Sequence, residues 1–147
     1  MTPLFVLCAA LVAAPSSAPA TVLRFDELLT LKPGGTLEWT DALKTLAGKR
    51  VRVVGFMAEM EKAPLGAFYL VPRPLVADES GGGSADLPPE AIRVVVRSAR
   101  GRPLAHIPRA LTVTGVLELG ARDEVDSLPS NIRIVLDAPP RSQKGAP

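Results

Sequence analysis

The 147-residue sequence contains one cysteine, one histidine and few aromatic residues. One cysteine excludes a disulfide framework, and one cysteine with one histidine cannot form a zinc site from these two residue types alone. Aromatic residues make up only 4% of the chain, which is poor material for a surface that stacks on nucleic-acid bases. A Ser-His-Asp triad is not indicated either, because the single histidine, His106, is not accompanied by a G-x-S-x-G motif. We therefore expect a single-domain protein that is not an enzyme.

Charged residues are missing from the start of the chain: all 17 Lys and Arg residues and all 15 Asp and Glu residues follow Ala20. Residues 4–14 form an apolar run too short to span a bilayer, and Ala18-Pro19-Ala20 has the small-x-small pattern of a cleavage site. We expect residues 1–20 to be a signal peptide, which predicts a periplasmic or secreted bacterial protein whose membrane contact is limited to this segment. A buried N-terminal helix is the alternative, since no Lys or Arg precedes the run. Cys8 lies inside the run, so we expect no lipid anchor there.

Two short helices are predicted before the first long strand. Asp26 can cap a helical turn within residues 24–31, which a Pro-Gly-Gly sequence then ends. Thr40 and Asp41 begin a second helix over residues 42–47, followed by a glycine that ends it.

Five later segments are predicted as β-strands from apolar-polar alternation or enrichment in β-branched and aromatic residues. They are residues 50–56, 67–71, 92–97, 111–119 and 131–137. A sheet that closes on itself buries their apolar faces, and Gly55 and Gly115 allow two of the strands to coil sharply. We therefore expect a mainly β fold, a small five-stranded OB-type barrel preceded by the two helices, over residues 21–138. A two-sheet sandwich is the alternative, and residues 139–147 are expected to form a disordered tail.

The connection between the second and third predicted strands, residues 72–89, is long for a compact domain, which is typical of functional or mobile loops. It begins Pro72-Arg73-Pro74, and the two prolines restrict the backbone around Arg73. The guanidinium could bind a carboxylate or phosphate through two hydrogen bonds, or form an ion pair with Asp78 or Glu79.

Three acidic residues, Asp78, Glu79 and Asp86, occupy the middle of this loop. Carboxylate oxygens suit a hard cation such as calcium, but the spacing is not that of an EF-hand loop. A solvated, flexible loop is the alternative, and we assign no metal site and no cofactor.

Seven arginines are distributed over the predicted strands and the turn after the third strand. They are Arg50, Arg52, Arg93, Arg97, Arg100, Arg102 and Arg109. Together they could form a basic face for an acidic partner or for anionic lipid. The alternative is pairing across strands with Glu118 and Asp137, which is an ordinary structural role. For His106, beside a proline in a loop, we also expect a structural role.

Three sequence motifs resemble a family of uncharacterised bacterial exported proteins and lipoproteins. They are G-K-R-V-R-V-V-G-F-M at residues 48–57, F-Y-L-V-P at residues 68–72 and L-P-P-E-A-I-R-V at residues 87–94. The resemblance covers roughly residues 38–119 and implies an OB-type envelope protein, while the family's function is undefined. In that family a Cys and a nearby His precede the Pro run, which suggests a metal or redox site. Residues 76–79 here read Val-Ala-Asp-Glu, without either residue.

The sequence therefore predicts an exported, non-catalytic binding or structural module of the bacterial envelope. Its expected contact region is the 72–89 loop and the adjacent sheet face, which would bind a protein or a small molecule. The candidate contact residues are Arg73, Asp78, Glu79, Asp86 and Tyr69. One alternative is a metal-handling accessory protein of an envelope transport system. A nucleic-acid-binding OB domain is the other, and it requires that the first 20 residues be retained.

Overall fold

The computed structural model describes residues 19–77, 87–124, 130–136 and 141–142. The expected mainly β fold is confirmed. The long strands are β4 (Arg50–Met57), β6 (Ala67–Val71), β8 (Ile92–Val96), β9 (Ala110–Arg122) and β10 (Ser130–Leu136). They coincide with the five predicted segments, and their ends differ from the prediction by at most three residues.

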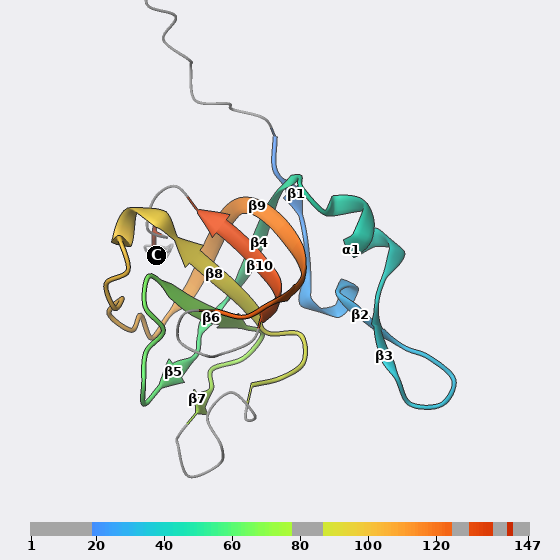
Figure 1. The fold of residues 1–147 in the computed structure, drawn as a ribbon, viewed down its shortest axis with the longest axis horizontal. Coiled ribbons are helices and arrows are strands. Elements are labelled where there is room, and N and C mark those ends of the chain that lie inside the picture. The colour runs from blue at the N-terminus through green and yellow to red at the C-terminus, as the bar shows by residue number, and fades with distance from the viewer. Residues whose placement is uncertain (1–18, 78–86, 125–129, 137–140, 143–147) are drawn as a thin grey trace, which may run out of the picture.

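The pairing of these five strands forms a continuous series. β4 pairs antiparallel with β6, and β6 pairs antiparallel with β8. β8 runs parallel to β10, and β10 pairs antiparallel with β9. β9 also pairs antiparallel with β4, so the series of hydrogen-bonded pairs returns to its first strand. In Figure 1 these strands curve around one another.

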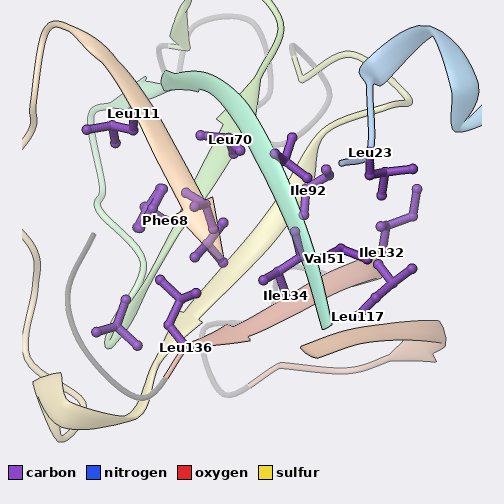
Figure 2. Close-up of a cluster of buried hydrophobic side chains, with 14 of the residues drawn as sticks. Leu23, Val51, Phe68, Leu70, Ile92, Leu111, Leu117, Ile132, Ile134 and Leu136 are labelled. Atoms are coloured by element: carbon purple, nitrogen blue, oxygen red, sulfur yellow. The ribbon is translucent and has the colours of Figure 1, made fainter. Parts of the chain in front are cut away.

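The main hydrophobic core lies between these strands, as Figure 2 shows. It forms because alternate side chains of each strand point to the same face, where Val51 and Val53 of β4 meet Leu111 and Val113 of β9. Each of these four side chains is at most 1% exposed. Burial of a Val or Leu side chain contributes about 1.5–3 kcal/mol, so this face accounts for much of the fold's stability.

Two glycines allow strands to approach each other closely in this arrangement. A Cβ built on Gly115 of β9 would lie 2.4 Å from the Val135 oxygen of β10. A Cβ built on Gly55 of β4 would lie 2.8 Å from the Val71 oxygen of β6 and 2.8 Å from the ring of Phe25. Both glycines were predicted as coiling points, and the structure gives the reason: no side chain fits at either crossing.

The N-terminal elements cover one end of this strand assembly. They are β1 (Thr21–Val22), the 3-10 turn η1 (Phe25–Glu27), β2 (Leu29–Leu31), β3 (Leu37–Trp39) and α1 (Asp41–Leu46). β1 runs parallel to the start of β4, while β2 and β3 form a separate hairpin. Leu23, Leu28 and Leu43 anchor these elements in the main core.

The structure changes two expectations, one for the first predicted helix and one for the predicted disordered tail. The first expected helix is a three-residue 3-10 turn whose N-cap is Arg24, and Asp26 lies inside the turn. Residues 141–142, placed in the disordered tail by the sequence, form β11 (Arg141–Ser142) and pair with Thr112 and Leu111 of β9. The reason is the length of β9, which has 13 residues and extends beyond the end of its pairing with β10.

Within the described part of the chain, no helix has the length and apolar character needed to cross a membrane.

Candidate functional site

A large pocket formed by described residues lies where β1, η1 and β4 meet both ends of the 72–89 loop. Its volume is about 950 Å³, and it is open to solvent. The wall is mostly apolar and comprises Val22, Leu23, Phe25, Val54, Val71, Pro72, Pro74, Leu75 and Pro88. Val22 and Val54 are 65% and 52% exposed, which leaves their side chains available for contact.

The backbone of β4 explains why the pocket is present. β1 pairs with β4 at Val51 and Arg52, and β6 pairs with it at Phe56 and Met57. Val54 therefore lies between the ends of two strand partners that lie on the same edge of β4. The chain turns away after Leu23 on one side and at Pro72 on the other, which leaves the hollow between them.

Among the described residues, four charged side chains line this pocket: Arg24, Asp26, Arg73 and Glu90. Arg24 Nε donates to Asp26 Oδ1 at 3.0 Å. This hydrogen bond, together with the attraction between the two charges, lowers the pKa of Asp26 and raises the pKa of Arg24. Within the described residues, Arg73 and Glu90 form no ion pair with each other or with any other group.

The five contact residues expected from the sequence are placed differently by the structure. Arg73 is exposed and lines the pocket. Asp78, Glu79 and Asp86 lie outside the described residues. Tyr69 is only 4% exposed and does not line the pocket. The structure thus places Arg73 and Tyr69 in separate surroundings.

Tyr69 belongs to a second apolar cluster on the outer face of β6. With Ala58 and Val71 it packs against a ring of partly buried residues: Phe56, Met60, Leu75, Leu87 and Ala91. β5 (Glu59–Met60) and β7 (Val76–Ala77) pair parallel in this region. The described ends of the 72–89 loop therefore pack over β6. The sequence signal for this cluster is the absence of polar residues from A-F-Y-L-V, which is typical of a strand buried on both faces.

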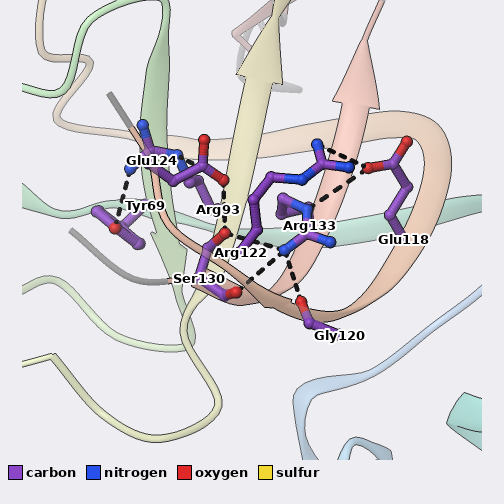
Figure 3. A network of polar contacts seen from close by, with 8 residues as sticks. All are labelled: Tyr69, Arg93, Glu118, Gly120, Arg122, Glu124, Ser130 and Arg133. Carbon is purple, nitrogen blue, oxygen red and sulfur yellow. Dashed lines mark hydrogen bonds and ion pairs between the residues drawn. The ribbon is translucent and has the colours of Figure 1, made fainter. Parts of the chain in front are cut away.

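Tyr69 also ends a row of polar residues that crosses four strands in register (Figure 3). Tyr69 of β6 lies opposite Arg93 of β8, Arg93 opposite Arg133 of β10, and Arg133 opposite Glu118 of β9. Arg93 Nη1 donates to Tyr69 Oη at 3.1 Å, and its guanidinium lies 5.5 Å from the centre of the tyrosine ring. We refer to these four residues as the polar row.

Gly120 near the end of β9, Glu124 just after it and Ser130 at the start of β10 complete the contacts of the polar row. Arg133 Nη1 donates to Gly120 O at 2.8 Å and to Ser130 O and Ser130 Oγ at 3.0 Å each. Ser130 Oγ donates to Glu124 Oε1 at 2.6 Å, and that carboxylate lies 3.8 Å from Arg93 Nε. Because these buried groups bind one another, we assign the polar row a structural role.

The seven arginines expected to form a basic face do not all share one environment. Arg93 is buried, whereas Arg50, Arg52, Arg97, Arg100, Arg102 and Arg109 are exposed. The expected partner Glu118 pairs instead with Arg122 at 3.6 Å and with Arg133 at 3.5 Å. Asp137 lies outside the described residues. Arg133 lies on the outer face of β10 but is 3% exposed, and its guanidinium contacts Gly120 of β9 and Ser130 of β10.

His106 lies on a smaller pocket of about 240 Å³, and its Nε2 is 3.1 Å from the carbonyl oxygen of Met57. Among the described residues, no group of three or more His, Cys, Asp or Glu side chains comes together in a way that could hold a metal ion.

Comparisons with known proteins give one structural neighbour and no relative by sequence. No protein-family model and no curated protein matches the sequence. The fold is similar to the crystal structure of a DUF3299 family protein from Pseudomonas aeruginosa, with a TM-score of 0.51 and 13% sequence identity over 87% of this chain and 100% of that chain. At this identity the similarity shows a shared fold. The neighbour belongs to a bacterial domain family of unknown function, which is the type of family that the sequence motifs resemble.

Proposed function

We propose that this protein is a non-catalytic binding module with an OB-type barrel, and that its binding site is the pocket between β1, β4 and the ends of the 72–89 loop. The observation on which the proposal depends is the pocket itself. Sites for small molecules are mostly apolar clefts of about 300–1,000 Å³ with a few polar groups, and this pocket has the same size and composition.

The strand order supports the OB-type barrel. Numbered along the chain, the five long strands pair in the order first, second, third, fifth, fourth and first again, with the third and fifth parallel. A five-stranded Greek-key barrel of the OB type requires such a closed series. The two glycine crossings at Gly55 and Gly115 suit strands that curve enough to close.

Export to the bacterial envelope is the second part of the proposal. The structured chain supports it because β1 begins at Thr21, immediately after the expected cleavage position at Ala20. Leu23, two residues later, is 2% exposed in the main core. Cleavage after Ala20 would therefore remove no residue that the described fold uses.

The absence of enzymatic activity is also a proposal, and the placement of two groups supports it. His106 Nε2 lies at hydrogen-bond distance from a backbone carbonyl oxygen. The buried Tyr69 hydroxyl accepts a hydrogen bond from Arg93. In the pocket, the charged groups are arginines and carboxylates suited to binding.

A substitution that fills the pocket tests the site. The ¹⁵N-labelled protein would be titrated with the small-molecule fraction and then the protein fraction of a bacterial envelope extract. We expect resonance shifts at Val22, Val54 and Val71, and their loss in Val54→Trp. Val116→Trp is the matched control, because Val116 of β9 is also an exposed strand valine, at 41%, but does not line the pocket.

Shifts that persist unchanged in Val54→Trp, or that never include pocket residues, would overturn the assignment of the site. Conversion of an extract component by the purified protein would overturn its non-catalytic character.

A further inference from the structure

We propose that the ligand of this pocket is a short apolar peptide with free termini, whose carboxylate binds Arg73 and whose ammonium binds Glu90. This inference rests on the proposed function and specifies the ligand class of the same pocket. The argument uses the charges at the pocket wall, the exposed apolar surface and the volume.

The charges of the pocket divide into a satisfied pair and an unsatisfied pair. Arg24 and Asp26 neutralise each other through a 3.0 Å contact. Arg73 and Glu90 have opposite charges and line the same pocket, yet no ion pair joins them, and neither pairs elsewhere within the described residues. Two separated, opposite charges are complementary to a ligand that has both charges itself.

The chemistry of Arg73 favours a carboxylate over a less specific contact. It lies between Pro72 and Pro74, whose rings restrict the backbone on both sides of it. A guanidinium offers parallel N–H donors that match the two oxygens of a carboxylate. Glu90, which is half-buried, provides acceptor oxygens for an ammonium group.

The apolar wall of the pocket favours a ligand with apolar side chains. Val22 and Val54 are more than half exposed here, and Phe25 and Leu75 extend the apolar surface. Burying this surface is favourable at about 25 cal/mol per Å². A ligand with charges but without apolar groups would leave this apolar surface exposed to water.

The volume and the strand edge favour a peptide over a free amino acid. About 950 Å³ is near the upper end of the range of about 300–1,000 Å³ for small-molecule sites, and is larger than one amino acid needs. Val54 also lies on β4 between the ends of β1 and β6, where an extended peptide could lie along the strand edge.

Calorimetry with the dipeptide Leu-Leu and its blocked forms tests the proposal on the purified protein. We expect Leu-Leu to bind, and acetylation of its amine or amidation of its carboxylate to weaken binding about tenfold each, as loss of one charged hydrogen-bonding group does. Free leucine, which has both charges but half the apolar surface, should bind more weakly than Leu-Leu.

Two variants assign each terminus to its residue. Arg73→Gln should weaken the binding of Leu-Leu about tenfold and leave the affinity for the amidated peptide unchanged, because that peptide has no carboxylate for Arg73 to bind. Glu90→Gln should weaken the binding of Leu-Leu by a similar factor and leave the affinity for the acetylated peptide unchanged. Arg50→Gln and Glu38→Gln are the matched controls, since these exposed residues do not line the pocket. Both control variants should bind Leu-Leu with the affinity of the unmodified protein.

Three results would overturn the proposal: no binding of Leu-Leu tighter than about 1 mM, equal binding of free and blocked peptides, or equal effects of the two variants on all peptide forms. If Leu-Leu does not bind, while another ligand binds the unmodified protein and does not bind Val54→Trp, the peptide class is wrong and the proposed binding site stands. If no ligand of the pocket is found at all, both proposals fail.

Discussion

Arg93 of β8 and Arg133 of β10 lie opposite each other in a parallel strand pair, and they are only 4% and 3% exposed. Two adjacent buried guanidinium groups are stable only when carboxylates and hydrogen-bond acceptors compensate them. Glu118 lies 3.5 Å from Arg133 Nε, and Glu124 lies 3.8 Å from Arg93 Nε. The outer face of the sheet therefore depends on the polar row and on the residues after β9 that complete its contacts.

Removal of the Tyr69 hydroxyl tests the importance of the polar row. In Tyr69→Phe, the buried Arg93 loses a 3.1 Å acceptor while the ring stays in place. We expect a loss of about 1.5–3 kcal/mol in the free energy of unfolding, which is typical for hydrogen bonds to charged groups. Urea denaturation measures it. Thr45→Ala, which removes an exposed hydroxyl hydrogen bond to the Asp41 carbonyl, is the control and should change stability far less. Similar losses in both variants would contradict the buried role of this contact.

A methyl group at Gly115 tests the close approach of β9 and β10. The added Cβ would lie 2.4 Å from the Val135 oxygen, so backbone atoms must move. We expect Gly115→Ala to destabilise the protein by about 1–3 kcal/mol, as overpacking does. Val116→Ala, one residue later and 41% exposed, should cost about 0.5 kcal/mol or less. Equal midpoints of thermal unfolding for the two variants would show that the crossing is looser than described.

The Thr40 hydroxyl joins α1 to the turn before β2. It accepts a hydrogen bond from Leu43 N at 3.1 Å and donates one to the carbonyl of Glu27. Thr40→Ala should lower stability by about 1 kcal/mol, as loss of an N-cap does. Thr40→Ser retains the hydroxyl and should restore most of the stability in the same denaturation measurement. Failure of serine to do so would assign the effect to the methyl group.

The titration of Asp26 tests the charge pair in the pocket. The hydrogen bond from Arg24, followed by its positive charge, lowers the pKa of Asp26 below its ordinary value of 3.8. A lowered folded-state pKa means that the pair stabilises the protein above the unfolded-state pKa, and that this contribution is lost as the pH falls through the folded-state value. We expect NMR titration of the Asp26 carboxyl carbon to give a midpoint below 3.8, and Arg24→Gln to move it upward. An unchanged midpoint in Arg24→Gln would exclude this cause.

Export is tested by the mass of the protein made in a bacterium. We expect the periplasmic or secreted form to begin at Thr21, because β1 starts there and residues 1–20 match a signal segment. Mass spectrometry of the cell fractions measures this. Changing Ala18 and Ala20 to bulky residues should block cleavage. A cytoplasmic protein that retains residues 1–20 would refute export and revive the nucleic-acid-binding alternative.

The positions of the long strands could be predicted from local patterns. In β4, Val51 and Val53 alternate with Arg50 and Arg52, and the burial follows that alternation. Gly55 and Gly115 were recognisable as coiling points because a glycine inside a strand is unfavourable unless two backbones approach closely there. Arg73 was identifiable from its flanking prolines, and it lines the pocket.

The burial of Arg93 and Arg133 could not be predicted in this way. Alternation correctly places both on the outer face, and an arginine on that face is ordinarily solvated. Only the tertiary structure brings Glu124, which is distant in sequence, next to Arg93, and links it through Ser130 to Arg133. These contacts compensate the cost of burying the two guanidinium groups. The place of Glu90 in the pocket could not be predicted for a similar reason, since the other walls of that pocket are β1, η1 and β4.

The sequence by itself determined which segments become strands, where two of them must coil and which faces are apolar, because these properties depend on side-chain periodicity and on the backbone freedom of single residues. Tertiary structure alone decided which charges are buried together and which line an open pocket. Those outcomes depend on distances between residues far apart in the chain, and the Coulomb and desolvation energies that govern them have no counterpart in a local pattern.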